Sequence, residues 1–185
     1  MAHPKILDAK TSALLVLDIQ EGFRNAIPEF GLIASRGATA VRGCQILGVP
    51  VFVTEQYPKG LGHTADEILS VLSDDAEVSE KTAFSSCGAE QFVAKLKASN
   101  VKQVVICGLE THVCVNQTAH DLLDRGFQVH LLTDCVCSRS EQNKAAGLAK
   151  MQSNGVLPSS IELALFELMR DAKHQSFKEI QALIK

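Results

Sequence analysis

The sequence is poor in aromatic residues and has no surplus of basic ones. It contains no tryptophan and one tyrosine, and its formal net charge at pH 7 is −3. Proteins that bind nucleic acids usually carry excess positive charge, and those that bind single strands interleave it with aromatic side chains. Both shortages argue against a general nucleic-acid binder, so we do not expect nucleic acid as a partner.

The sequence shows no recognisable targeting or membrane-spanning pattern. No apolar run reaches the roughly 20 residues that a membrane helix needs. The beginning, MAHPKILDAKTS, has neither the apolar core of a secretion signal nor the arginine-rich composition of a transit peptide. We therefore expect a soluble, cytoplasmic protein that does not bind membranes, with mitochondrial import by another signal as the alternative.

Metal, redox and nucleotide motifs are missing as well. No CxxC is present, and Cys135-x-Cys137 is spaced too tightly for a zinc knuckle or a thioredoxin-like motif. The glycines form neither a GxGxxG pattern nor a P-loop. We expect no metal site and no cofactor. We also expect the cysteines to be reduced, with Cys44, Cys107 and Cys135 in apolar core positions.

What the chain does have is a regular alternation of short β-branched runs and longer amphipathic stretches. Continuous apolar strands of this kind are typical of a parallel sheet that helices cover on both faces. No linker, low-complexity tract or repeat interrupts the pattern, so we predict one doubly wound α/β domain over residues 1–185. The expected strands are 13–18, 50–55, 77–82, 101–108, 128–134 and 155–158, and the expected helices are 30–47, 64–72, 88–98, 112–125, 138–153, one after Ser159 and one from Ser176.

Polar and aromatic residues follow the predicted strands directly. In open α/β sheets, ligands bind beyond the carboxyl ends of the strands, near a switch in strand order. The residues at these positions, in strand order, are Asp18, Gln20, Glu21 and Phe23; Glu55, Gln56 and Tyr57; Lys81, Thr82 and Phe84; Gly108, Glu110, Thr111 and Cys114; and Asp134 and Arg139.

Cys114 falls in the first turn of its predicted helix if Thr111 is the N-cap. Unpaired N–H groups and the positive end of the helix dipole favour a thiolate there, and the same groups could hold a developing oxyanion. A buried structural cysteine is the common alternative, and position alone leaves the two interpretations nearly even.

Asp18 and Lys81 have comparable alternatives. Asp18 could cap a loop, or it could take a proton from Cys114 and pass it to a leaving group. Lys81 could be an ordinary surface lysine, or it could lie in the cleft, anchor Asp18 and favour the thiolate. His112 lies two residues from Cys114, so a Cys–His pair is not indicated on a helix. The shared position of the three residues at strand ends makes them a candidate site.

Three segments, LLVLDIQEGF, EKTAFSS and VVICGLETHVCVNQTAHDLLDRGFQV, resemble the isochorismatase-like cysteine hydrolases, which are relatives of the nicotinamidases. TEQYPKGLGHT and HQSFKEIQALIK are more particularly similar to the isochorismatase domain-containing proteins. The resemblance spans nearly the whole chain. It implies a three-layer, six-stranded parallel sheet and a catalytic triad of Asp18, Lys81 and Cys114.

The resemblance also implies a mechanism. Cys114 would form a thioester with a substrate carbonyl, Asp18 would shuttle the proton, and Lys81 would balance the charge. A cis peptide is implied between Leu109 and Glu110, with the backbone amides of Glu110 and Cys114 as the oxyanion hole. Nicotinamidases carry an Asp-x-His metal cluster after the second strand, whereas this sequence reads TEQYPKG there, so metal-assisted nicotinamide binding is not expected.

We therefore expect a hydrolase that acts on an amide or related acyl bond of a small molecule. Gln20, Phe23, Tyr57 and Phe84 would line the substrate pocket, although each aromatic side chain could instead belong to the core or rim. A binding or regulatory protein without turnover remains an alternative. A ribonuclease has the least support, although Lys81 and Arg139 could attract phosphate.

The resemblance further implies a homo-oligomer, because members of this family commonly associate. The apolar side of the C-terminal helix could form the interface between subunits. The alternative is that this helix only packs on its own sheet.

Overall fold

A six-stranded parallel sheet forms the centre of the molecule in the computed structural model, which describes residues 3–74, 76 and 78–185. Its strand order is β3-β2-β1-β4-β5-β6. The strands are β1 (Ser12–Leu17), β2 (Val51–Gln56), β3 (Val78–Lys81), β4 (Gln103–Leu109), β5 (Gln128–Cys137) and β6 (Leu157–Ser159). The predicted doubly wound parallel sheet is confirmed. Residue 77, the first of the predicted third strand, lies outside the described residues.

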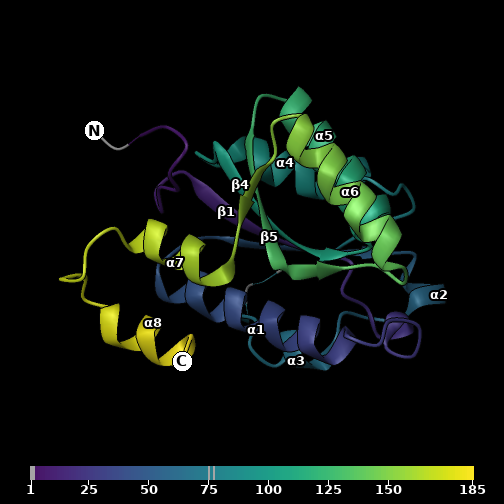
Figure 1. Ribbon diagram of the computed structural model, residues 1–185, viewed down its shortest axis with the longest axis horizontal. Coiled ribbons are helices and arrows are strands. Elements are labelled where there is room, and N and C mark those ends of the chain that lie inside the picture. Colours follow the sequence, from purple (N-terminus) through teal and green to yellow (C-terminus); the bar gives the residue numbers. More distant parts are fainter. Residues whose placement is uncertain (1–2, 75, 77) are drawn as a thin grey trace.

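Helices cover both faces of the sheet, as Figure 1 shows. One face carries α1 (Phe30–Ile46), α3 (Asp66–Leu69), α7 (Ile161–Met169) and α8 (Phe177–Leu183), and the other carries α4 (Glu90–Ala98), α5 (Asn116–Asp124) and α6 (Glu141–Ser153). Four shorter elements connect them: η1 (Glu21–Phe23), α2 (Pro58–Leu61), η2 (Ser86–Gly88) and the π-helical turn η3 (Thr111–Val115). No helix in the described part of the chain is long and apolar enough to cross a membrane.

Strand β1 shows why its sequence is an unbroken apolar run. Successive side chains of a strand point to opposite faces of the sheet. Leu14 and Val16 belong to the core on the α1 face, whereas Leu15 and Leu17 belong to the core beneath α4 and α5. Because both faces are covered, every position of the strand has to be apolar or small.

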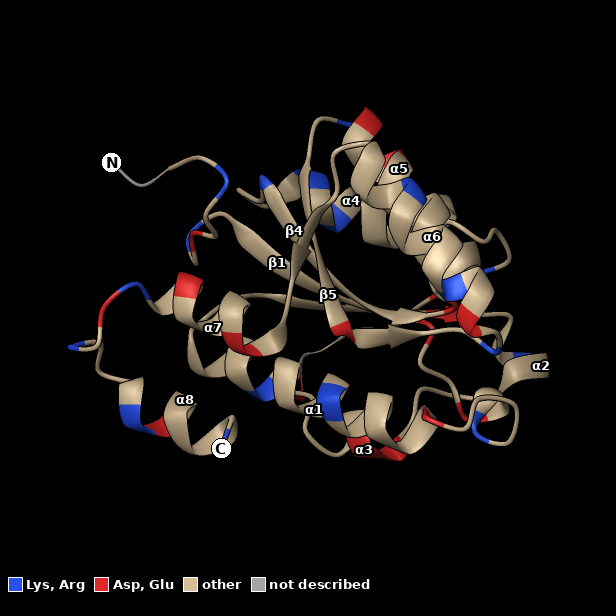
Figure 2. Ribbon diagram, in the orientation of Figure 1, with Lys and Arg blue, Asp and Glu red and all other residues tan. Residues whose placement is uncertain are grey.

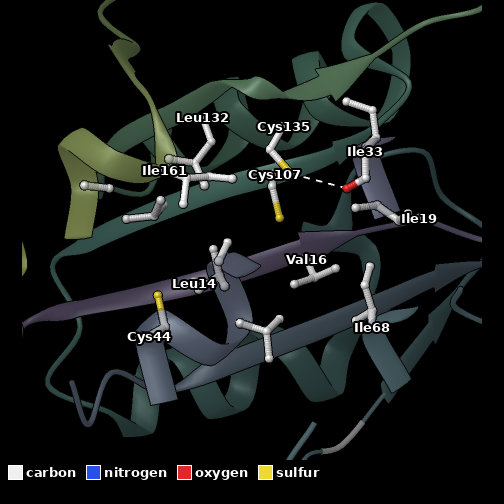
Figure 3. Packing of buried hydrophobic residues seen from close by; sticks show 14 of the residues in the cluster. Leu14, Val16, Ile19, Ile33, Cys44, Ile68, Cys107, Leu132, Cys135 and Ile161 are labelled. Carbon is white, nitrogen blue, oxygen red and sulfur yellow. Dashed lines mark hydrogen bonds between the residues drawn. The ribbon is translucent and has the colours of Figure 1, made fainter. Parts of the chain in front are cut away.

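The core on the α1 face contains four of the cysteines, Cys44, Cys107, Cys135 and Cys137, and Figure 3 labels the first three. Cys44, Cys107 and Cys135 are all buried, which confirms their predicted core positions. The Cys135 thiol donates a hydrogen bond to the carbonyl oxygen of Ile33 at 3.6 Å, marked by the dashed line in Figure 3. All six cysteines of the chain are described and are free thiols.

Two predicted helix starts are wrong by one or two residues. Ser140, not Ser138, caps α6, and Ser160, not Ser159, caps α7, each accepting a hydrogen bond from an amide in the first turn. Ser138 follows β5 directly, and its hydroxyl lies 3.0 Å from Nδ1 of His112. Ser159 is the last residue of β6, so its backbone is extended.

The C-terminal helix α8 packs on its own fold. Ile180 is fully buried in the core on the α1 face. The ring of Phe177 lies 6.4 Å from that of Phe166 on α7, measured between centroids. The helix thus packs on its own fold, and its expected part in a subunit interface stays a prediction.

The strand order reverses between β1 and β4, at the centre of the sheet. Leu17 pairs with Gly108 where these two strands end. Gly108 has a φ of 152°, and a Cβ at this position would overlap the carbonyl oxygen of Leu17. Only glycine permits this close approach. The chain segments that leave β1 and β4 therefore diverge from a common point, where ligands bind in sheets of this type.

Candidate active site

Asp18 and Lys81 form a buried ion pair at the carboxyl edge of the sheet. Nζ of Lys81 lies 2.6 Å from Oδ2 of Asp18, and the two side chains are 0% and 1% exposed. The ammonium also donates to Oε1 of Gln56 at 3.0 Å and to the carbonyl oxygens of Ala83 and Phe84 at 3.3 and 2.9 Å. A buried charge needs such pairing. All N–H groups of Lys81 are thus directed at protein acceptors.

Asp18 directly follows β1 and adopts a left-handed conformation, with a φ of 53°. The Thr54 hydroxyl donates to its Oδ1 at 2.9 Å. Burial raises the pKa of Asp18 above its usual range, while the charge of Lys81 and hydrogen bonds from Lys81, Thr54 and the Cys114 thiol act in the opposite direction. Three donors from three different elements therefore meet on this carboxylate.

Cys114 lies in the π-helical turn η3, which begins two residues after β4 ends. The predicted N-cap is wrong, because Glu110 precedes the turn and Thr111 belongs to it. The hydroxyl of Thr111 is buried without a hydrogen-bond partner among the described residues. The amides of Val113 and Val115 donate to the carbonyl oxygen of Glu110 at 3.0 and 3.3 Å. These two hydrogen bonds fix the turn to the backbone of Glu110. In this position the Cys114 thiol contacts Asp18.

The surroundings of Cys114 raise its pKa to about 12. Burial is the largest cause, the negative charge of Asp18 is the second, and the positive charge of Lys81 opposes both. The residue is 7% exposed. Our expectation that the helix start would favour a thiolate is therefore wrong for the resting protein, in which Cys114 is a neutral thiol beside a carboxylate.

The peptide bond between Leu109 and Glu110 is cis. The Glu110 side chain is buried, and its Oε1 accepts hydrogen bonds from the backbone N–H of Arg139 at 2.9 Å and from Nε of Arg139 at 3.0 Å. Burial acts to raise the pKa of Glu110, but the contacts with Arg139 hold this pKa below its usual range. The ends of β4 and β5 are therefore joined by an ion pair next to η3.

Gln20 and Phe23, which were both expected to line a pocket, contact other parts of the fold. Gln20 is fully buried, and its amide donates to the carbonyl oxygens of Gln56 and Gly62 at 3.1 and 2.7 Å. Its own carbonyl accepts from the Gln56 N–H at 2.7 Å, so the side chain holds the chain after β2. Phe23 is partly buried and packs against the core on the α1 face. The expected place of these two side chains in a substrate pocket stays a prediction.

Tyr57 and Phe84 are 54% and 53% exposed at the same edge. Tyr57 has a left-handed φ of 39° and precedes the one-turn helix α2. It borders an open hollow of about 430 Å³ whose other lining residues are Pro58, Lys59, Glu80, Lys81, Thr82 and Gly88. Tyr57 therefore lies on the rim of this hollow, which Lys81 also lines.

Thr54 is a site residue that the sequence analysis missed. Its hydroxyl bonds Asp18 and lies 3.1 Å from Oγ of Ser86, whose backbone N–H donates to Oγ1 of Thr118 at 2.8 Å. All four residues are buried. The available signal was a polar residue inside the apolar strand VFVTE, where the sheet register pairs it with Leu17, next to Asp18.

The described residues do not form a metal-binding cluster. No group of three or more His, Cys, Asp or Glu side chains among them could hold a metal ion. At the end of β2, Oε1 of Glu55 accepts from the N–H and hydroxyl of Thr64 at 2.6 and 2.7 Å, and Oε1 of Gln56 accepts from Lys81. Because these oxygens are already engaged, the segment does not fit the Asp-x-His cluster of nicotinamidases.

Comparison with known proteins places the chain among close relatives. The model of the isochorismatase domain matches residues 12–162. Isochorismatase domain-containing protein 1 of Salmo salar is 44% identical over 95% of this chain, and isochorismatase domain-containing protein 2 of Danio rerio is 40% identical over 96% of it. The chain covers 61% of the Salmo salar protein and 89% of the Danio rerio protein. It therefore spans about three fifths of the length of the first relative.

Solved structures share the fold over nearly the whole chain. The MAR1 ribonuclease from Caenorhabditis elegans is 37% identical, with a TM-score of 0.92 over 97% of this chain and 92% of that one. The zinc complex of the pyrazinamidase of Pyrococcus horikoshii is 25% identical, with a TM-score of 0.71 over 80% of this chain and 98% of that one. The Escherichia coli YcaC protein is described as an octameric hydrolase of unknown specificity. It is 21% identical, with a TM-score of 0.85 over 100% of this chain and 97% of that one, and this likeness concerns the fold alone.

Proposed function

The chain belongs to the isochorismatase domain family, and from this premise we propose that it is a small-molecule hydrolase with Cys114 as its nucleophile. Its substrate would be an amide or a related C–N or acyl compound. One observation carries the proposal: the Cys114 thiol and the Lys81 ammonium both contact the buried carboxylate of Asp18. A nucleophile, a base and a fixed cation in contact are what covalent catalysis by a cysteine requires.

In the first half-reaction, Sγ of Cys114 attacks the substrate carbonyl carbon while its proton moves to Asp18. Because the thiol pKa is about 12, proton transfer has to accompany the attack at neutral pH. The backbone N–H groups of Glu110 and Cys114 are the proposed donors to the oxyanion. Asp18 then gives the proton to the leaving nitrogen, the C–N bond breaks, and a thioester remains on Cys114.

In the second half-reaction, water attacks the thioester carbonyl and gives a proton to Asp18. The C–S bond breaks, Asp18 returns the proton to the sulfur, and the carboxylic acid leaves. The Lys81 ammonium donates to Asp18, to Gln56 and to the carbonyl oxygens of Ala83 and Phe84. Its proposed task is to hold Asp18 in position and offset its negative charge.

The decisive test is release of ammonia from a panel of small primary amides. We expect Cys114→Ala to lower turnover about a thousandfold or more, because the variant lacks the nucleophile. Cys87→Ala is the matched control, since Cys87 lies in η2, where its amide donates to Oγ of Ser85 and the nearby charges are those of Arg125 and Asp121. Equal turnover in wild type and Cys114→Ala would refute the proposal. Mass spectrometry of the wild type during turnover should detect the acyl group on the Cys114 peptide.

Cleavage of RNA is a second candidate, because the chain is 37% identical to the C. elegans MAR1 ribonuclease. The net charge of −3 weighs against it. A labelled RNA should be incubated with wild type, Cys114→Ala and Asp18→Asn over a series of salt concentrations. Salt-dependent binding and cleavage that both variants abolish would favour this function over amide hydrolysis. A protein that turns over neither amides nor RNA would instead support the non-catalytic alternative.

A further inference from the structure

Two buried hydroxyl groups, those of Ser86 and Thr54, form a chain that leads to Asp18. Oγ of Ser86 lies 3.1 Å from Oγ1 of Thr54, and the Thr54 hydroxyl donates to Oδ1 of Asp18 at 2.9 Å. Ser86 and Thr54 are 0% exposed and Asp18 is 1% exposed. Ser86 belongs to η2 and Thr54 to β2, whereas Asp18 follows β1. The hydroxyl chain therefore joins three separate segments at the proposed base.

The Thr54 hydroxyl fixes the direction of the hydroxyl chain. A hydroxyl has one proton, and an ionised carboxylate can only accept hydrogen bonds, so the Thr54 proton is committed to Asp18. The contact between Ser86 and Thr54 then takes its proton from Ser86. When each hydroxyl donates to the next group, the bonds polarise one another and the last bond is strengthened. In this chain the last bond is the one to Asp18.

Both oxygens of the Asp18 carboxylate depend on the segment that follows β3. Oδ2 lies 2.6 Å from Nζ of Lys81, the last residue of β3, and the same ammonium donates to two carbonyl oxygens of the loop after it. Oδ1 accepts from Thr54, whose oxygen faces Ser86 at the end of that loop. One donor on each oxygen sets the plane in which the carboxylate meets the Cys114 thiol.

The backbone of Ser86 is anchored independently of its hydroxyl. Its N–H donates at 2.8 Å to Oγ1 of Thr118, a buried residue of α5. Helix α5 continues directly from η3, the turn that contains Cys114. Because the bond to Thr118 uses the backbone of Ser86, removal of the hydroxyl leaves this attachment in place. A substitution of Ser86 therefore tests the hydroxyl itself.

We propose that Ser86 is a positioning residue that acts on Asp18 through Thr54. Its hydroxyl directs the Thr54 hydroxyl toward Oδ1 and strengthens the bond there. The carboxylate thereby keeps the ionised form and the orientation that proton transfer from Cys114 requires. The inference rests on the proposed function, because it concerns the base of the same site.

The test measures the pKa of Asp18 by NMR, from the chemical shift of its carboxyl carbon across pH, with Asp18→Asn to assign the signal. The charge of Lys81 and hydrogen bonds from Lys81, Thr54 and the Cys114 thiol lower this pKa against the effect of burial. A weaker Thr54 bond therefore raises it. We expect Ser86→Ala to raise the pKa of Asp18 by about 0.3 of a pH unit, which is a fraction of the effect of Thr54→Val.

Ser85→Ala is the matched control. Ser85 is the neighbouring residue, and its hydroxyl accepts from the N–H of Cys87 instead of belonging to the hydroxyl chain. This variant should leave the pKa of Asp18 at its wild-type value. Ser86→Cys retains a weak S–H donor, so it should give a smaller upward shift than Ser86→Ala, and it takes the place of Ser86→Ala if that variant does not fold.

A double-variant cycle separates action through Thr54 from a general loosening of the site. Thr54→Val breaks the hydroxyl chain, so adding Ser86→Ala to it should change the pKa of Asp18 by less than about 0.1 of a pH unit. An equal shift with and without Thr54 overturns the proposal, and so does an unchanged pKa in Ser86→Ala. A shift that requires Thr54 supports it.

The measurement needs no substrate, so the inference and the proposed function can fail separately. Absence of amide turnover together with a shift that requires Thr54 would refute the hydrolase and keep the action of Ser86 on Asp18. Cys114-dependent hydrolysis together with a pKa of Asp18 that is indifferent to Ser86 would overturn the inference and keep the hydrolase.

Discussion

At the scale of single residues, Asp18 has two opposite effects on Cys114. Its charge helps to raise the pKa of the thiol, yet it is also the group that we propose as the proton acceptor. A residue that suppresses the free thiolate can still serve catalysis, because it removes the proton at the moment of attack. This arrangement keeps the nucleophile unreactive toward other electrophiles while no substrate is bound.

Asp18→Asn should therefore separate reactivity from turnover. Removing the carboxylate takes away a cause of the raised pKa of Cys114, while the charge of Lys81 still lowers it. We expect the alkylation midpoint to move below about 12 by about one to three pH units, while amide turnover falls about a hundredfold or more. Lys81→Met should move the midpoint in the opposite direction. Alkylation of Cys114 by iodoacetamide across pH measures the midpoint in each variant. Identical midpoints in wild type, Asp18→Asn and Lys81→Met would contradict the proposed effects of Asp18 and Lys81 on the thiol.

Substitution of Thr54 offers a test of Asp18 as the catalytic base. Asp18 has to be ionised to accept a proton, so activity should rise with pH through the raised pKa of Asp18. The Thr54 hydrogen bond lowers this pKa, and Thr54→Val removes it, so the acid limb of kcat/KM should move upward by about half a unit to one unit. Thr39→Val, which removes a hydroxyl on α1 that bonds a carbonyl within its own helix, is the control. A downward shift of the limb would contradict the role of Asp18.

Residue positions were more predictable than residue environments. Asp18, Lys81 and Cys114 could be singled out because strand ends converge at one edge of a parallel sheet, and the structure brings Asp18 and Lys81 into contact. The pKa of Cys114 could not be predicted, since it depends on burial and on the charge of Asp18, which belongs to a distant part of the chain. Thr54 was missed because a single hydroxyl in an apolar strand does not reveal its partner.

At the scale of elements, the approach of β1 and β4 depends on Gly108. A side chain there would overlap the backbone of Leu17, which cannot rotate away. We expect Gly108→Ala to lower the free energy of unfolding by about 2 to 4 kcal/mol. Gly31→Ala is the matched control: no atom lies near its added Cβ, and alanine favours the helix, so stability should rise slightly. Urea denaturation measures the stability of both variants. Equal midpoints for wild type and Gly108→Ala would refute the requirement for glycine at this position.

The predicted elements are right in type and order, and wrong mainly at their ends. The helix predicted from Ser138 begins later because β5 continues past an irregular register and pairs Cys137 with Leu109. That extension depends on the neighbouring strand, so no local pattern around Ser138 could show it. The π-helical turn around Cys114 was likewise not predictable from an N-cap pattern, because Glu110 and not Thr111 precedes it.

At the scale of the whole molecule, the surface is mixed in charge. Figure 2 shows basic and acidic residues interspersed along the outer helices, in keeping with the small net charge of −3. Apolar side chains are also exposed on α7, where Leu163 and Phe166 lie one turn apart and are 45% and 38% exposed. Neighbouring apolar groups on one helix face are more consistent with a contact surface than singly scattered ones.

We therefore expect the protein to self-associate through α7. Sedimentation velocity over a range of concentrations should show an oligomer that dissociates on dilution. Leu163→Glu should weaken association, because the contact would bury an unpaired charge. Leu69→Glu, at an exposed leucine on α3, is the control and should behave as wild type. A wild-type protein that remains monomeric at every concentration would contradict this expectation.

Three of the four thiols in the core on the α1 face can report when the molecule unfolds. Cys44, Cys107 and Cys135 lie buried under the helices of that face, whereas Cys87 is partly accessible in the native state. A thiol reagent applied in short pulses would label Cys87 at once, and would label Cys44, Cys107 and Cys135 only in molecules whose sheet has come apart. The lag between the two classes of label would then time spontaneous unfolding under native conditions, without any introduced probe.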